Sequence, residues 1–244
     1  MHAFGQILKI ETRLYLRDFT SPLITIALPL ALLVVFGLIP AGRERNPQFG
    51  DRAFIEYFAP SLLVITLAMS AVNILPIVLA TYRERGVLRR LATTPASPAA
   101  LLAAQLVISL ATILVGAVLL IGVGWLAFDV PLPRHPLGFT LALVLGTAAL
   151  LALGLLVAAM ARTTKAAQGL AVPVFMVTMF FGGVYLPRFL LPDFLVRIGD
   201  YTPPGVQALL DAWTADAPQP LPLAIMTVIA VIAGATAAKL FRWE

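Results

Sequence analysis

The densest group of charged side chains in the sequence lies between Tyr82 and Pro98, in the segment YRERGVLRRLATTPASP. It holds four arginines and one acid, Glu84, and it separates two long uncharged runs. Guanidinium and carboxylate groups form strong charge-assisted hydrogen bonds, which suits the binding of a partner. The segment therefore indicates a contact with something outside the apolar parts of the chain.

The other residues that carry chemistry form no catalytic pattern. None of the five serines lies in a Gly-x-Ser-x-Gly motif, and the two histidines, His2 and His135, lie at the edges of apolar runs. The apolar runs hold no paired acids and no His/Asp cluster at metal-ligand spacing. The sequence also lacks a Gly-Lys pair and hence a phosphate-binding loop. We predict no catalytic or metal site, which argues against an intramembrane hydrolase, and any ATPase must be another polypeptide.

The elements that position the charged segment are membrane helices. With 60% hydrophobic and 12% charged residues, the chain is too apolar for a water-soluble fold. Six uncharged windows each exceed the roughly 20 residues that a helix needs to cross the bilayer. We expect an all-α membrane protein with six spanning helices near residues 21–40, 57–80, 99–127, 137–161, 166–187 and 220–240. Internal prolines predict kinks in three of them, at Pro29, Pro76 and Pro173.

The distribution of positive charge predicts the orientation. If the N-terminus is cytoplasmic, that side carries eleven Lys and Arg residues and the other side six, which favours both termini inside. The net charge of +5 then reflects topology, and no nucleic-acid partner is predicted. Before the first span, three cations recur every four residues opposite an apolar face, at Lys9, Arg13 and Arg17. This predicts an amphipathic helix over residues 1–20 in the membrane interface, in contact with lipids.

The spanning windows argue against an ion-coupled carrier and against a channel. Their central parts hold no Asp, Glu, Lys or Arg, although an ion-coupled secondary carrier usually needs one. An ion-coupled secondary carrier is therefore kept only as the alternative interpretation. A channel is disfavoured because no polar stripe lines a pore. Candidates for a cargo path are one amide and a soft apolar run: Asn73, Phe175, Met176, Met179, Phe180 and Tyr185. Ordinary helix packing explains these residues at least as well, and it also explains the small residues Ala142, Gly146, Gly154 and Ala158.

The charged segment has the spacing of a short amphipathic helix from Arg83 to Ala92. Thr94, which precedes Pro95, ends it, and Ser97 and Pro98 are the expected N-cap and first residue of the next span. Gly86 costs such a helix about 1 kcal/mol relative to alanine, so we expect another backbone to approach it closely. On periodicity alone, docking of a partner and anchoring of arginines to anionic lipid are equally supported.

The same segment closely resembles the cytoplasmic loop of ABC-2 type transporter permeases, the membrane subunits of a class of bacterial ABC exporters. The matching positions are Glu84, Arg85, Gly86, Leu88, Arg90, Leu91, Thr94 and Pro95. In that family the loop is a coupling helix that docks on a separate ATPase subunit. The resemblance implies a coupling loop over residues 82–98, with the contact carried by Glu84, Arg85, Gly86, Val87, Leu88, Arg89, Arg90 and Leu91. We expect its acid and apolar face, more than its arginines, to meet the ATPase.

A second segment resembles the outer re-entrant hairpin of the same family, between the fifth and sixth spans. It covers residues 186–212 and the glycines before them, and its marker residues are Gly182, Gly183, Pro187, Pro192, Pro203 and Pro204. Pro204 departs from the family pattern, which commonly has a bulky apolar residue after the first proline. Prolines and charges divide the segment into pieces too short to span.

The resemblance covers nearly the whole chain and implies a single transmembrane domain over residues 1–244. It implies a multi-pass protein of the bacterial inner membrane that works with a second permease, identical or paralogous, and with an ATP-binding subunit. That subunit would bind ATP and Mg, and this chain would hold no cofactor. The expected cargo is hydrophobic or amphiphilic, such as a drug, an antibiotic or a lipid-linked molecule.

Overall fold

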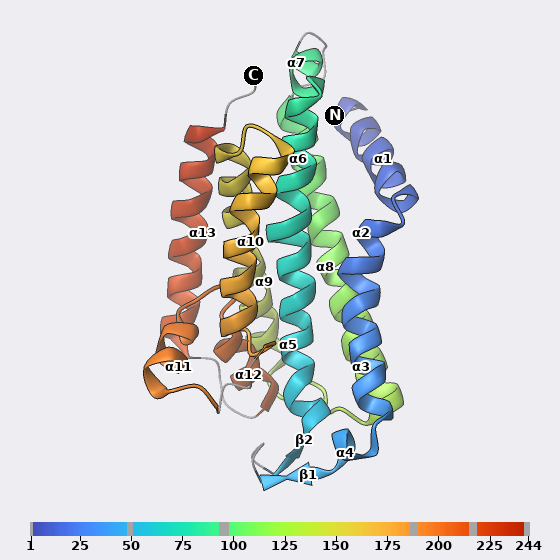
Figure 1. Cartoon of the computed structure of the whole chain (residues 1–244), viewed down its shortest axis with the longest axis vertical. Helices are drawn as coiled ribbons and strands as arrows, with labels where there is room; N and C mark the ends of the chain where they lie inside the picture. The colour runs from blue at the N-terminus through green and yellow to red at the C-terminus, as the bar shows by residue number, and fades with distance from the viewer. Residues whose placement is uncertain (1, 48–50, 93–97, 186–189, 215–218, 242–244) are drawn as a thin grey trace.

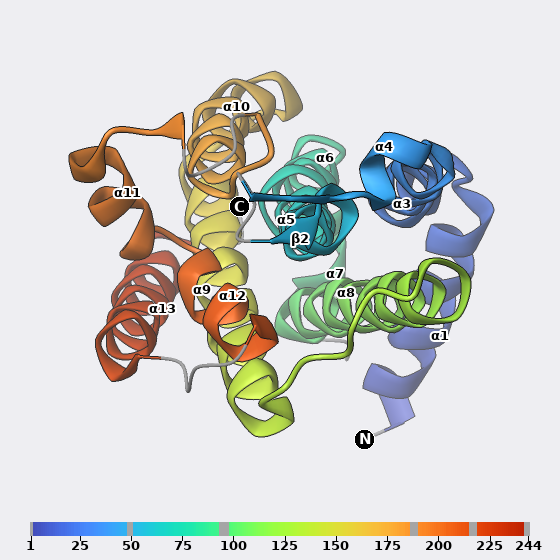
Figure 2. The same ribbon diagram turned by 90° about the horizontal axis from the view of Figure 1, so that it is seen from below.

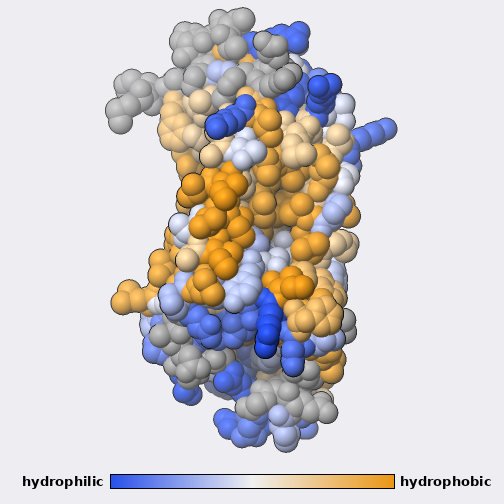
Figure 3. All heavy atoms as spheres, turned by 90° about the vertical axis from the view of Figure 1, so that its left-hand side faces the viewer, coloured by the Kyte–Doolittle hydropathy of each residue, from blue (hydrophilic) through white to orange (hydrophobic). Residues whose placement is uncertain are grey.

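The computed structural model describes residues 2–47, 51–92, 98–185, 190–214 and 219–241. Six helical spans are long and apolar enough to cross a membrane: Thr20–Leu38, Phe54–Glu84, Pro98–Phe128, Pro136–Met160, Thr164–Phe181 and Pro220–Leu240. They confirm the six predicted spans, but the second runs three residues further at its start and four at its end, and the fifth, predicted over 166–187, already ends at Phe181. Figure 3 shows the apolar band that these spans form between two hydrophilic ends.

The first span consists of α2 (Thr20–Pro22), η1 (Leu23–Ala27) and α3 (Leu28–Leu38), and the second of α5 (Phe54–Ala68), η3 (Met69–Ile74) and α6 (Leu75–Glu84). Single helices form the others: α8 (Pro98–Phe128), α9 (Pro136–Met160), α10 (Thr164–Phe181) and α13 (Pro220–Leu240). Short elements connect or precede them: α1 (His2–Arg17), α4 (Pro40–Arg43), β1 (Arg45–Asn46), β2 (Arg52–Ala53), α7 (Val87–Ala92), α11 (Asp193–Asp200) and α12 (Val206–Thr214). The antiparallel β1–β2 pair is a small addition to the all-α prediction.

The second span is the centre of the bundle. In its most apolar window 72% of the residues are buried, against 22% in the first and sixth spans. It packs against α3, α8, α9 and α10, and Figure 2 shows α5 surrounded by these four helices. The sixth span, α13, packs chiefly along α9. A displacement of the second span would therefore be transmitted directly to four of the other five spans.

Two of the internal prolines follow wide helical turns. Pro29 comes after the π-helical segment η1, and Pro76 comes after the π-helical segment η3. A proline ring clashes with the carbonyl four residues earlier in a regular α-helix, and a π turn makes room there. In this chain those carbonyls belong to Thr25 and Val72, which lie inside the two π segments. The sequence predicted the irregularity at both prolines, and the structure shows its form.

The small residues of α9 do allow close approach, as predicted. Ala142, Gly146, Gly154 and Ala158 are all buried. A Cβ at Gly154 would overlap the carbonyl oxygen of Ala71 in η3, and one at Gly146 would overlap that of Pro204. Glycine at these two positions lets α9 touch the backbone of the central span at one end and of the α11–α12 turn at the other.

The two ends of the bundle differ. Both chain termini and α7 lie at one end, while α4, β1, β2, α11 and α12 lie at the other (Figure 1). The start of α1 and the end of α13 therefore lie at the same end of the bundle, and the predicted orientation, with both termini in the cytoplasm, stays a prediction.

The segment after the fifth span contains two short helices rather than a spanning one. Gly182 and Gly183 follow α10, Pro192 precedes α11, and the buried Pro203 and Pro204 join α11 to α12. Pro187 lies outside the described residues. α12 packs against α9 and α5, and Trp213 Nε1 donates to the carbonyl of Pro131 at 2.9 Å. Whether the pair is re-entrant in a bilayer stays a prediction.

Candidate coupling site at the end of the second span

The predicted short helix is interrupted at Gly86. α6 continues to Glu84, and α7 begins only at Val87. Gly86 has φ of +68°, and nothing lies within 4 Å of a Cβ added there. The expectation of a close backbone approach is therefore wrong for the described part of the chain. Glycine is favoured here because a left-handed residue ends α6 and redirects the chain into α7.

Glu84 binds the beginning of the fifth span. Its Oε2 accepts hydrogen bonds from the backbone N–H of Thr164, at 2.9 Å, and from the Thr164 hydroxyl, at 2.7 Å. Thr164 is the first residue of α10, where backbone N–H groups lack partners in the helix and the helix dipole favours an anion. The hydroxyl of Thr81, one turn earlier in α6, lies 3.2 Å from that of Thr164. Glu84 thus holds α6 against α10.

Arg83 binds the end of the fourth span. Its Nη1 donates to the carbonyl of Ala158 at 2.8 Å and to the carbonyl of Ala161. These groups belong to the last turn of α9 and its C-cap, where carbonyls lack helical partners and a cation is favoured. The guanidinium also lies over the ring of Phe241, 4.9 Å from its centre. We call Arg83 and Glu84, with their partners on α9 and α10, the clamp.

The clamp bears on which side chains of the charged segment are exposed for contact with a partner. Glu84 is engaged with Thr164, and Leu88 is 2% exposed because α7 packs it against the bundle. Val87 and Leu91 are half-buried. The exposed side chains of the segment are Glu84 and the arginines Arg85, Arg89 and Arg90. At the end of the molecule where α7 protrudes, Arg85 and Arg89 are thus exposed beside Glu84, which is bonded to Thr164, whereas Val87, Leu88 and Leu91 are half-buried or buried (Figure 1).

The candidate cargo-path residues do not converge. Phe175 and Met179 are buried, Phe180 is half-buried, Met176 is exposed on the fifth span, and Tyr185, which follows that span, is also exposed. The Tyr185 hydroxyl donates to Met176 Sδ at 3.4 Å. Asn73 is half-buried in η3, in the central span. These side chains therefore do not line one path within a single chain.

Sequence reasoning missed two kinds of residue. Arg83 and Thr164 escaped because their partners lie on other spans. Glu11 escaped because it was counted only as a charge, although it lies four residues from Ile7 and from Tyr15, on the apolar face of α1. The position of Glu11 on that apolar face was a signal that the sequence offered. Gln105 was missed too, and its signal was a polar amide early in a long apolar helix. Both residues are buried.

Comparison with protein families gives a match over most of the chain. The family model described as ABC-2 type transporter matches residues 2–204, which include the clamp, α7 and α11. No curated protein and no solved structure matches the chain.

Proposed function

Because the chain belongs to the ABC-2 type transporter family, we propose that it is the membrane subunit of an ATP-driven exporter in a bacterial inner membrane. It is a multi-pass membrane protein, and permeases of this family generally partner with an ATP-binding subunit. In the proposal, two permeases, identical or paralogous, pair in the membrane. Each binds an ATP-binding subunit, which holds ATP and Mg.

The observation that carries the proposal is the clamp, because it links α7 to the spans. α7 is joined to the central span through Gly86 and is packed on the bundle through Leu88. One residue before this corner, Glu84 is bonded to the start of α10, and Arg83 is bonded to the end of α9. A push on α7 is thus transmitted to the second, fourth and fifth spans together, as rigid helices transmit displacement.

The exposed arginines define the kind of surface that α7 would meet. Arg85 and Arg89 are exposed at the corner and on the short helix, and their charge favours an acidic groove on the ATP-binding subunit. Charge complementarity of this kind sets the register and the rate of docking more than the affinity.

The described spans support an apolar or amphiphilic cargo. Their buried polar residues are chiefly serines and threonines, and three threonines bond to carbonyls of their own helix: Thr66 to Leu62, Thr112 to Ile108 and Thr178 to Val174. Such hydroxyls are already satisfied and offer little to a strongly hydrated solute. A drug, an antibiotic or a lipid-linked molecule fits this lining.

The assembly is tested by co-expression with the ATP-binding subunit encoded beside this chain. We expect the two to co-purify, and we expect proteoliposomes to move cargo with ATP and Mg. If no ATPase is retained, and an ion gradient drives transport without nucleotide, the chain is a secondary carrier and the proposal is wrong.

The clamp is tested by a double-mutant cycle between Glu84 and Thr164. We expect Glu84→Ala to lower ATP-driven transport by about threefold to tenfold, since charge-assisted hydrogen bonds are lost, while the ATP-binding subunit is still retained. Thr164→Val removes only the hydroxyl bond and should cost less. The double variant should be no slower than Glu84→Ala alone, because the two residues act as one unit.

Glu44→Ala serves as the matched control, because Glu44 is an exposed carboxylate that directly follows α4, at the opposite end of the bundle. It should leave transport unchanged. Additive effects of the Glu84 and Thr164 substitutions would show that the clamp does not transmit the movement.

A further inference from the structure

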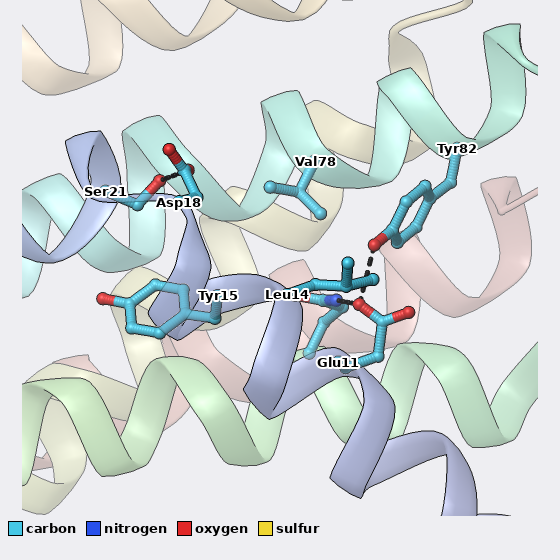
Figure 4. Close-up of a pocket in the computed structure, with 8 residues that line it drawn as sticks. Glu11, Leu14, Tyr15, Asp18, Ser21, Val78 and Tyr82 are labelled. Carbon is cyan, nitrogen blue, oxygen red and sulfur yellow. Dashed lines mark hydrogen bonds between the residues drawn. The ribbon is translucent and has the colours of Figure 1, made fainter.

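A cavity of about 140 Å³ lies between α1, α6 and α8 (Figure 4). Its inner wall holds a polar group built from three elements. Oε2 of Glu11 accepts a hydrogen bond from the hydroxyl of Tyr82 and another from Nε2 of Gln105, both at 2.7 Å. The carboxylate is thereby held in one orientation.

Glu11 forms no ion pair with the residues that the structure describes; the cation that acts on its polar group is Arg85, through the hydroxyl of Tyr82. The residue is only 9% exposed, and both of its donors are neutral and bind the same oxygen. No described residue forms an ion pair with it or donates to its Oε1. Buried carboxylates are normally balanced by a cation, because the desolvation of an unbalanced charge is strongly unfavourable.

The mouth of the cavity adds a second carboxylate. Asp18 is exposed, and its Oδ2 accepts from the hydroxyl of Ser21. Its Oδ1 accepts from the backbone N–H of Thr20 at 3.3 Å. None of the described residues that line the cavity is a lysine or an arginine, so the lining carries a formal charge of −2. The cations of α1, namely Lys9, Arg13 and Arg17, are all exposed.

The remaining wall is apolar and aromatic. Leu14, which is 50% exposed, and Val78 line the cavity together with the residues Tyr15 and Tyr82. Aromatic faces attract cations, and aliphatic side chains pack on an alkyl chain. Outside the mouth, Phe19 is 75% exposed and Leu23 43%, at the start of the first span. These two side chains neighbour the cavity residues Asp18 and Ser21 in the sequence, and they form an exposed apolar strip at the start of the span.

We propose that this cavity binds the ammonium head group of an amphiphile, with its alkyl tail on the apolar strip of Phe19 and Leu23. The ammonium supplies the missing positive charge, which balances Glu11 inside the cavity and also attracts Asp18 at its mouth. Since a water molecule takes about 30 Å³ of liquid, the volume suits about four or five groups of that size, such as an ammonium and its first three carbons. Phosphatidylethanolamine and an amine-bearing cargo share this chemistry. The proposal concerns binding only and stands whether or not the chain is an exporter.

Calorimetric titration of the purified chain in phosphatidylcholine nanodiscs tests the proposal, with dodecylamine and dodecanol as probes at neutral pH. The two share a tail and differ in charge. We expect dodecylamine to bind at least tenfold more tightly. Glu11→Gln should remove most of that difference, and Asp18→Asn, which keeps the oxygen that bonds to the Thr20 N–H, should weaken dodecylamine binding by about threefold. Glu44→Gln, at the far end of the bundle, should change neither affinity.

Equal affinity for the two probes, or unchanged dodecylamine binding in both cavity variants, would overturn the proposal. If Glu11→Gln does not elute as a folded species, Asp18→Asn alone decides, because Asp18 is exposed. The source of the amine is distinguished by native mass spectrometry from nanodiscs with phosphatidylethanolamine and phosphatidylglycerol. Retention of phosphatidylethanolamine that Glu11→Gln abolishes identifies the lipid, whereas equal retention beside tight dodecylamine binding identifies an amine-bearing cargo.

Discussion

Arg83 and Glu84 are neighbours in the sequence, yet they bind opposite ends of the turn between α9 and α10. Successive side chains of a helix point about 100° apart, so two adjacent residues reach two different neighbouring helices. The signs of the charges fit the helix ends they meet, since the cation lies at the C-terminus of α9 and the anion at the N-terminus of α10. Gly86 then turns the chain away, so that the arginines after Glu84 face outward.

At this scale, Gly86→Ala should lower the stability of the corner by about 1–2 kcal/mol, since alanine disfavours the left-handed conformation. No steric contact opposes the added methyl group. A thermal-shift measurement of the purified chain, together with ATP-driven transport, checks both stability and coupling. We expect transport to fall more than thermal stability, because α7 loses its direction while the bundle stays intact.

Gly169→Ala is the matched control for Gly86→Ala. Gly169 lies in α10, its added Cβ also meets open space, and its φ is not positive. Alanine should therefore leave transport unchanged and stabilise the helix by up to about 1 kcal/mol. Equal effects at the two glycines would mean that the left-handed conformation of Gly86 is not needed.

At the scale of elements, the central span and α9 form the closest helix contact that the glycines reveal. η3 widens the second span before Pro76, and Gly154 brings α9 against the carbonyl of Ala71 in that widened turn. Small residues allow such approach in membranes, where van der Waals packing is a main source of helix association. The clamp joins the same two helices about one turn further along α9, where Arg83 bonds to the carbonyl of Ala158.

Gly154→Ala should therefore destabilise the bundle by about 1–3 kcal/mol, because the added methyl group overlaps backbone that cannot rotate away. Gly122→Ala in α8 is the comparison, since nothing lies within 4 Å of its added Cβ. Thermal shifts of both variants in the same detergent measure the difference. Similar melting temperatures for Gly154→Ala and Gly122→Ala would show that α9 and η3 can move apart without loss of stability.

At the scale of the whole molecule, both termini and α7 share one end, and the excess of Lys and Arg predicts that this end is cytoplasmic (Figure 1). The opposite end carries α4, the β1–β2 pair and the α11–α12 pair. Under the proposed function, the first end meets the ATP-binding subunit and the second end forms the outer mouth of the transporter.

The absence of cysteine from the sequence makes this orientation directly testable. We expect Arg89→Cys, in α7, to react with a membrane-impermeant maleimide only in inside-out vesicles. Glu44→Cys should react only in right-side-out vesicles. Both positions are exposed, so the label reports sidedness rather than burial. Reversed labelling would invert the topology and exclude α7 as the docking helix.

The sequence by itself determined the six spans, because charged side chains are excluded from hydrocarbon and their spacing bounds most of the helices within a few residues. The fifth ends at Phe181 rather than at 187, because the chain turns at Gly182 and Gly183 before it reaches a charge. It also located the irregular turns at Pro29 and Pro76 and the packing stripe on α9, since both depend on local backbone chemistry.

Only the tertiary structure decided which charges are used within the chain. Arg83 and Glu84 find their partners about 80 residues further along, and Glu11 finds Gln105. Partners at that separation are chosen by which helices pack side by side, and no periodicity in one helix encodes them. For the same reason, the aromatic and methionine residues of α10 looked like one surface in the sequence and are divided between the core and the outside of the bundle.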